Sequence, residues 1–160
     1  MTISVGDKIP VVDLNIMTDD GPQTLSTNEI FTGKKIALFG LPGAFTRTCS
    51  ARHLPGFIDN AEIIKAKGIT TIACISVNDI FVMNAWGKAQ GTENHIMMLA
   101  DGSAKFAQAT ELDVDMSDKG FGVRCKRFSM IVDNCVIKNL NVDAQGVFEV
   151  SSAEVMLGEL

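Results

Sequence analysis

The sequence lacks closely spaced cysteine pairs. Its four cysteines lie at positions 49, 74, 125 and 135, so none forms a CxxC pair or the paired spacing of a zinc finger. This spacing argues against a structural zinc site and against a dithiol oxidoreductase. In a reducing compartment each cysteine is by default a free thiol, so any reactivity must come from its surroundings.

The sequence also lacks an excess of basic residues and any apolar stretch long enough to cross a bilayer. With 14 Lys and Arg against 19 Asp and Glu, the net charge is -5, and no basic stripe favours nucleic-acid binding. The first residues, MTISVGDKIPVVDL, have neither the charged nor the sustained apolar region of a signal peptide. We therefore expect a soluble cytoplasmic protein that binds neither nucleic acid nor membrane.

No low-complexity tract or domain-sized repeat interrupts the chain. Its 160 residues are 46% apolar and 21% charged, which is typical of an ordered globular protein. A chain of this length can bury a hydrophobic core without a metal ion or disulfides. We expect a single domain over residues 1–160.

The order of the predicted elements indicates the fold class. Buried strands are predicted over 34–41, 69–77 and 95–100, and helices over 47–67, 79–90 and 103–110. Gly68 is expected to end the first helix, and Pro55 to kink it. Residues 127–142 predict an antiparallel hairpin that turns at Asp133 and Asn134, and Ser151 with Glu154 predicts the capping box of a final helix. Right-handed βαβ units followed by a hairpin and a helix predict a thioredoxin-like α/β fold, with a central mixed β-sheet flanked by helices.

Cys49 lies where a strand gives way to a helix. If Thr46 is the N-cap, Cys49 falls in the first helical turn, facing unpaired N–H groups and the positive end of the helix dipole. Both favour a thiolate over a thiol, and a hydrogen bond from one nearby arginine would add about 1.5 to 3 kcal/mol. Ionisation alone gains only about 30-fold in reactivity, so a large rate enhancement requires transition-state stabilisation. Without a motif, a buried core cysteine would be the more common role.

The segment PGAFTRTCS supplies that motif. It resembles the P-x-x-x-T-x-x-C site of peroxiredoxins, with Pro42, Thr46 and Cys49 in the matching positions, and its PGAFT wording is that of the type II, or fifth, subfamily. The similarity continues through HLPGF, ISVND, AWGKA, LADG and KRFSM, and so covers nearly the whole chain. The resemblance implies a thiol peroxidase on a thioredoxin-like fold, which requires no metal or organic cofactor.

The resemblance also implies roles for individual residues. Cys49 would attack a hydroperoxide such as hydrogen peroxide or an alkyl hydroperoxide and become a sulfenic acid. Thr46 and Arg127 would hold the sulfur and the peroxide oxygens, and Pro42 would shield the site. Further candidates for the substrate pocket are Gly43, Phe45 and His53. His53 lies four residues after Cys49, so on a helix it would share the face of Cys49 and border the pocket; a cap or a hydrogen bond to the backbone is an equal alternative. A homodimer is implied by the resemblance alone.

The sequence departs from the family at Arg47, where most relatives carry proline. The added cation would attract anionic substrates if it faces the site, whereas a solvated side chain pointing outward is an equal alternative. Phe45 and Trp86 likewise have two roles open to them, in an apolar mouth for organic peroxides or in the core or a subunit interface.

Recycling of the sulfenic acid is the second departure. Some type II relatives use a cysteine near the carboxy terminus, where this chain has Ser151 and Ser152. Cys74 matches the second cysteine of plant-type relatives, but its predicted central strand would have to unfold locally before it reached Cys49. We expect one-cysteine behaviour, with an external thiol such as glutathione, glutaredoxin or thioredoxin as the reductant. Cys125 and Cys135 are expected to be incidental.

Two other functions stay open at this point. One is a redox sensor that is oxidised at Cys49 and passes the oxidation to a protein partner by disulfide exchange. The other is a noncatalytic binding module with a thioredoxin-like fold, in which Cys49 is an ordinary thiol.

Overall fold

A seven-stranded mixed sheet forms the centre of the structure, which is a computed structural model that describes residues 2–160. The strand order is β2-β1-β5-β4-β3-β8-β9; β3, β4 and β5 run parallel, and the remaining pairs are antiparallel. The strands are β1 (Asp13–Thr18), β2 (Gly21–Ser26), β3 (Lys35–Gly40), β4 (Thr71–Ser76), β5 (Met97–Ala100), β8 (Phe128–Asp133) and β9 (Val136–Val142). A separate two-stranded sheet pairs β6 (Asp113–Asp115) with β7 (Val123–Cys125).

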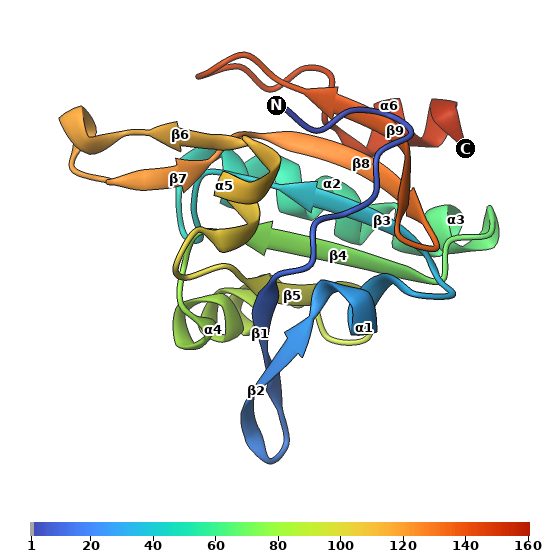
Figure 1. Cartoon of the computed structure of the whole chain (residues 1–160), viewed down its shortest axis with the longest axis horizontal. Helices are drawn as coiled ribbons and strands as arrows, with labels where there is room; N and C mark the ends of the chain where they lie inside the picture. The colour runs from blue at the N-terminus through green and yellow to red at the C-terminus, as the bar shows by residue number, and fades with distance from the viewer. Residues whose placement is uncertain (1) are drawn as a thin grey trace.

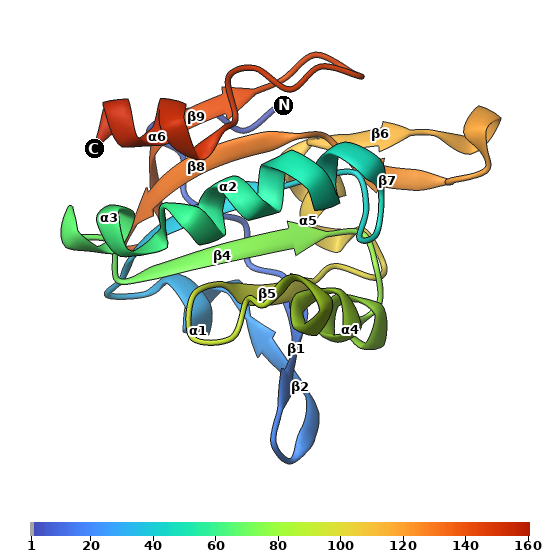
Figure 2. The same ribbon diagram turned by 180° about the vertical axis from the view of Figure 1, so that it is seen from behind.

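Helices cover both faces of the main sheet (Figures 1 and 2). On one face, Phe39 of β3 belongs to a core that includes α2 (Leu54–Asp59), α3 (Ala61–Ala66), α4 (Ile80–Gln90) and α6 (Ala153–Glu159). On the other face, Leu38 of the same strand belongs to a core with α1 (Thr27–Phe31) and α5 (Lys105–Thr110). Successive side chains of a strand point to opposite faces, so a continuous apolar run is what a strand buried on both sides requires. The predicted α/β class and the three parallel strands are confirmed.

The predicted helix over residues 47–67 is interrupted. A π-helical turn, Cys49–His53, in which the Leu54 N–H bonds to the Cys49 carbonyl five residues back, comes before Pro55, and Pro55 lies in the first turn of α2. A second break lies at Asn60, whose side chain donates to the Gly56 carbonyl at 2.8 Å. Asparagine competes with the helical backbone in this way, which explains a break that the apolar periodicity does not predict. Gly68, with φ +99°, ends the segment as expected.

Two predicted turn and cap positions are wrong by one residue. The hairpin between β8 and β9 turns at Asn134 and Cys135, both with positive φ, because Asp133 already pairs with Val136. The N-cap of α6 is Ser152, whose hydroxyl accepts from the Val155 N–H at 3.2 Å, and not Ser151. Ser151 is buried and bonds elsewhere, as described below.

Two hairpins are additions to the predicted elements. β1 and β2 project from the sheet as a ribbon (Figure 1), and β6 with β7 forms the second. The exposed residues of β2 give little apolar alternation, so its period-2 signal is weak.

A complete capping box, Ser26 with Glu29, lies at the start of α1. Over residues 2–160 no helix has the length and apolar character needed to span a membrane.

Gly40 permits the close packing of β3 against β8. It pairs with Phe128, and a Cβ atom built on Gly40 would lie 2.1 Å from Cε1 of the Phe128 ring. That ring is fully buried, so it has little room to move. The glycine is therefore required by the neighbouring aromatic ring at the end of the strand that leads into the Cys49 loop.

We predict that Gly40→Ala lowers the free energy of unfolding by about 1 to 3 kcal/mol, because the added methyl overpacks the Phe128 ring. Urea denaturation measures the change. Gly158→Ala is the control, since nothing lies within 4 Å of its Cβ position in α6 and alanine should there gain about 0.5 to 1 kcal/mol. Adding Phe128→Leu to Gly40→Ala should recover part of the loss; an unchanged stability in Gly40→Ala would contradict the packing argument.

Candidate active site

Cys49 lies just beyond the carboxyl end of β3, in the first turn of the helical segment. Ser50 N–H donates to the Thr46 carbonyl at 3.0 Å, which begins the segment and leaves Cys49 near its amino end, as predicted. The Cys49 side chain is fully buried among core residues. Its sulfur bonds to Arg127, which lines the pocket described below, although Cys49 is not itself among the lining residues.

Arg127 supplies the positive charge beside this sulfur. It lies directly before β8, which pairs with β3, so the sheet brings Arg127 to Cys49 across 78 residues of sequence. Its Nη2 donates to the Cys49 sulfur at 3.3 Å, and its Nη1 bonds to His53 Nδ1 at 3.0 Å. The planar guanidinium thus uses two nitrogens at once, a geometry that lysine cannot reproduce.

His53 is a fully buried partner of Arg127. Its Nε2 lies 3.0 Å from the Ser151 carbonyl, which can only accept, so Nε2 carries the proton and Nδ1 accepts from Arg127. Burial, together with the charge of Arg127, lowers the pKa of His53 from 6.5 to about 3. The imidazole is therefore neutral at physiological pH, and it orients the guanidinium without repelling it. His53 also contacts the rings of Phe39, Phe57 and Phe148.

Asp143 closes the loop that carries the Ser151 carbonyl. Its carboxylate accepts from the N–H groups of Glu149, Val150 and Ser151 at 3.0, 2.7 and 3.3 Å, and from the Ser151 hydroxyl. Its own N–H donates to the Arg127 carbonyl at 2.9 Å. A continuous series of bonds thus runs from Asp143 through Ser151, His53 and Arg127 to the sulfur.

The PGAFT loop is fixed by bonds from outside it. Ala44 N–H donates to Asn78 Oδ1 at 3.0 Å, and Arg124 Nη1 lies 3.4 Å from the Pro42 carbonyl. Gly43 is buried, and a Cβ on it would come within 3.0 Å of Arg124 Nη1. Thr46 immediately precedes the helical segment, but its hydroxyl donates to the Gly43 carbonyl at 2.7 Å instead of capping a helical N–H. The expected side-chain cap is therefore replaced by a bond that ties the loop to itself.

The remaining sequence candidates fall in different places. None of the predicted pocket residues Gly43, Phe45 and His53 is among the residues that line the pocket described below. Phe45 is 59% exposed, with φ +62°, whereas His53 is buried and bonds to the backbone at Ser151. Trp86 is fully buried in the core, and its Nε1 donates to the Ser50 hydroxyl at 3.0 Å, which favours the core role over the apolar mouth. Arg47 is exposed and lines the pocket.

Cys74 is buried in the centre of β4, on the same face of the sheet as Cys49. Burial raises the pKa of its thiol well above the ordinary value, and the nearby Cys49 adds to the shift. A thiol in this state is a poor nucleophile. Burial raises the pKa of Cys125 in the same way.

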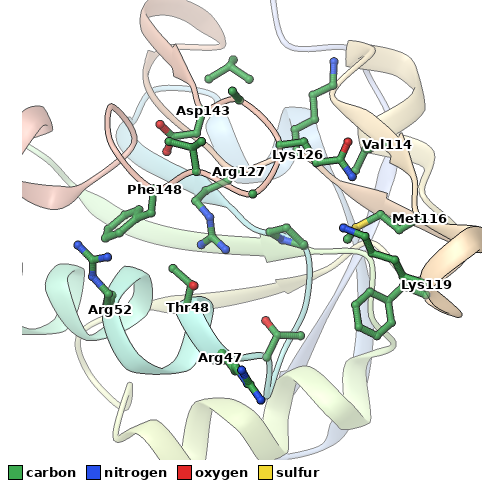
Figure 3. A pocket seen from close by; sticks show the side chains of 18 residues that line it. Arg47, Thr48, Arg52, Val114, Met116, Lys119, Lys126, Arg127, Asp143 and Phe148 are labelled. Atoms are coloured by element: carbon green, nitrogen blue, oxygen red, sulfur yellow. The ribbon is translucent and has the colours of Figure 1, made fainter.

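A pocket of about 930 Å³ opens beside Arg127 (Figure 3). Pro42 and Thr46 line it from the PGAFT loop, Arg127 lines it from the sheet, and residues 142–148 form another wall. Phe148 lies over the guanidinium of Arg52 at 4.8 Å. No group of three or more His, Cys, Asp and Glu side chains between residues 2 and 160 is arranged to hold a metal ion.

This arrangement suits attack by a sulfur anion on a bond that releases negative charge. The guanidinium and the N–H groups of a helix start can stabilise charge that moves from sulfur to a departing oxygen. Comparison with known proteins identifies the chemistry. The Redoxin family model matches residues 4–157. Peroxiredoxin-2C of Arabidopsis thaliana is 47% identical over 99% of this chain and 98% of its own.

The chain belongs to the peroxiredoxin family. Among solved structures, reduced Prx3 of Vibrio vulnificus in complex with H2O2 is 48% identical, with a TM-score of 0.96 and 99% of each chain covered. The 1-Cys peroxiredoxin of Plasmodium falciparum is 30% identical, with a TM-score of 0.90 and 96% of each chain covered. The resemblance to type II peroxiredoxins and the thioredoxin-like fold are confirmed, and this peroxiredoxin is a thiol-dependent peroxidase.

Sequence reasoning on this peroxiredoxin missed Arg124 and Asp143. Arg124 donates to the backbone carbonyls of Pro42 and Val77, which are far from it in sequence, so no local sequence pattern predicts these bonds. Asp143 follows a strand and bonds to an irregular loop, where neither periodicity nor a capping rule applies. Asn78 lies within the ISVND similarity, so that match contained a signal for it.

We predict that His53 makes the stability of the protein fall with acidity. Its pKa is about 6.5 when unfolded and about 3 when folded, so between these values only the unfolded chain takes up the proton. The free energy of unfolding should therefore decrease by about 1.4 kcal/mol per pH unit as the pH falls from about 5.5 to 4, and should not depend on His53 above about pH 7.5.

Urea denaturation of the wild type and of His53→Gln over this pH range measures the contribution. The glutamine amide can bond to the same two partners but does not titrate. The free energy of unfolding should therefore depend less steeply on pH in His53→Gln, by an amount that corresponds to nearly one bound proton. His95→Gln is the control for loss of a histidine elsewhere. Parallel slopes in wild type and His53→Gln would show that the buried imidazole is not neutral.

Proposed function

We propose that Cys49 is the nucleophile of this peroxidase and that hydrogen peroxide and alkyl hydroperoxides are its substrates. The sulfur anion attacks the terminal oxygen of the peroxide, an S–O bond forms, and the O–O bond breaks. Cysteine is oxidised by two electrons to sulfenic acid, and the departing oxygen takes a proton from solvent and leaves as water or an alcohol. No metal or organic cofactor takes part in these steps.

The observation that carries the proposal is the 3.3 Å contact between Arg127 Nη2 and the Cys49 sulfur. A charged donor beside a buried sulfur favours its anion, and the same donor meets the negative charge as it moves to the departing oxygen. His53 and Asp143 support this role because they hold the guanidinium in place before the substrate arrives.

Thr46 and Pro42 have supporting roles in the proposed mechanism. The Thr46 hydroxyl donates its hydrogen bond to the Gly43 carbonyl, so its oxygen remains available to accept a hydrogen bond from the O–H of a peroxide. Pro42 lines the pocket and is half-buried, which suits a side chain that limits the approach of water to the sulfur.

We further propose that an external thiol, glutathione with glutaredoxin or thioredoxin, reduces the sulfenic acid. The high pKa and full burial of Cys74 argue against a second cysteine that acts within the chain. The pocket is large enough to admit a thiol of the size of a peptide. These thiols are kept reduced in the cytoplasm, which is the compartment we propose for the enzyme.

Stopped-flow oxidation of the reduced protein by hydrogen peroxide tests these roles. Cys49→Ser should abolish oxidation, and Arg127→Gln should slow it by about 10² to 10³, the usual loss for one preorganised charge-stabilising donor. Arg127→Lys should recover only a small part, since lysine cannot bond to the sulfur and His53 with a fixed fork. Cys74→Ser is the control and should keep the wild-type rate.

The same variants test recycling. Turnover with an external thiol should be equal in the wild type and in Cys74→Ser. An intramolecular Cys49–Cys74 disulfide, detected by mass spectrometry in the oxidised wild type, would refute one-cysteine recycling. A wild-type oxidation rate in Arg127→Gln would refute the assigned role of the guanidinium.

We also propose that the enzyme is a homodimer. Phe45 and Phe81 are 59% and 66% exposed, and the bond between Ala44 and Asn78 brings the loop of Phe45 to the segment that leads into α4, where Phe81 lies in the first turn. Two exposed aromatic side chains on neighbouring segments favour burial against another copy. Sedimentation equilibrium should give twice the 17.2 kDa chain mass, and Phe81→Ser should shift the equilibrium toward monomer. Ile63→Ser, which changes an exposed apolar residue of α3, is the control; a monomeric wild type would refute the proposal.

A further inference from the structure

The pocket beside Arg127 is far larger than hydrogen peroxide requires. A water molecule occupies about 30 Å³ in the liquid, and hydrogen peroxide has only one more heavy atom. The pocket, at about 930 Å³, is in the range of sites for organic ligands. The volume of the pocket does not define its ligand, but the charge of its lining residues is mostly positive.

Cations line several sides of this pocket. Arg47, Arg52 and Lys119 lie around Arg127 on different sides in Figure 3; the first two belong to the helical segment that begins at Arg47, and Lys119 belongs to the turn between β6 and β7. All three are exposed, and we call them the cationic rim. Arg127 already bonds to Cys49 and His53, so the rim residues are left to meet a ligand anion, together with the half-buried Lys126, which also lines the pocket.

The negative charge in the pocket lining already has hydrogen-bond partners within the protein. Asp143 is the one acidic residue among the pocket-lining residues of the described chain, and its oxygens accept the bonds from Glu149, Val150 and Ser151. The local excess of positive charge contrasts with the net charge of -5 on the whole chain. A pocket of this kind raises the local concentration of anions.

Apolar side chains line the space between these cations. They are Val114, Met116, Phe121, Val142, Val147 and Phe148. An organic chain would bury apolar surface against them, which a small inorganic peroxide cannot do. The lining therefore matches a molecule with an apolar body and an anionic end.

We propose that this pocket selects organic hydroperoxides that carry a carboxylate, and that Arg47 and Lys119 of the cationic rim determine the preference. The inference rests on the proposed peroxidase role of Cys49. The hydroperoxide group meets Cys49 and Arg127, and the carboxylate stays at the rim. The sulfur attacks the terminal oxygen, the O–O bond breaks, and the hydroxy acid leaves after its new alkoxide takes a proton from solvent.

Arg47 is the residue that adds specificity in this chain. It occupies the first helical position, where proline is common in proteins because a residue there does not need its N–H for the helix. The helix start therefore tolerates either residue, and the difference between them is one positive charge at the mouth of the pocket. That charge is what the proposed substrates would recognise.

Linoleic acid hydroperoxide and its methyl ester provide a matched test, since they share the peroxide and differ in one charge. Rates of Cys49 oxidation are measured by stopped flow with fully reduced protein and no thiol, which isolates this step from recycling. The ratio of the acid rate to the ester rate should exceed one at about 0.01 M salt and approach one at about 1 M, as the Debye length falls from about 30 to 3 Å.

Variants locate the preference. Arg47→Gln and Lys119→Gln should each lower the ratio by about two- to six-fold, the effect of one unit charge at about 8 Å in water or in a medium of half its dielectric constant. Arg47→Pro should match Arg47→Gln if charge, and not backbone geometry, is responsible. Arg47→Glu should lower the ratio further. Lys67→Gln removes an exposed cation at the far end of α3 and is the matched control.

Three results would overturn the inference. A wild-type ratio of one that is insensitive to salt would refute anion selection while leaving the peroxidase role intact. A salt-dependent ratio that is unchanged in the Arg47 and Lys119 variants would refute the assignment to the cationic rim. Failure of both hydroperoxides to oxidise Cys49 would refute the proposed function itself.

Discussion

The contact between the Arg127 guanidinium and the Cys49 sulfur is the interaction on which the site depends. Arg127 lines the pocket and Cys49 is fully buried beside it, where the low local dielectric makes a charge pair strong and an unpaired charge costly. The sheet makes the contact possible, because β8 pairs with β3 and so brings Arg127 to the end of the strand that leads into the Cys49 loop. Gly40 leaves the space that the Phe128 ring occupies where these two strands pair.

The neutrality of His53 makes the Arg127 contact compatible with burial. A charged imidazole in that place would repel the guanidinium. The neutral ring instead accepts a hydrogen bond from Arg127 and donates one to the Ser151 carbonyl, so both ring nitrogens are held in place. Asp143 then fixes Ser151 and part of the pocket wall together. The charge balance of the site therefore follows from burial, since burial is the main reason that His53 does not take up a proton.

The sequence was sufficient to predict the parallel strands, the helix start at Cys49 and the candidate pair Cys49 and Arg127. Strands buried on both faces have a strong apolar signal, and the motif similarity joined residues far apart in the chain. The sequence did not predict the helix break at Asn60, where a side chain bonds to a backbone carbonyl. It also did not predict which of the adjacent residues Ser151 and Ser152 is the N-cap of α6. It also missed Asp143 and Arg124, because both act on backbone groups that only the folded chain brings near.

The bond between Trp86 and Ser50 has a further consequence. The chain has one tryptophan and no tyrosine, so its intrinsic fluorescence comes almost entirely from a single indole. That indole is fully buried and donates to the residue directly after Cys49. The protein therefore carries a native optical probe one residue from the sulfur, and its emission spectrum reports on the start of that helical segment without any label.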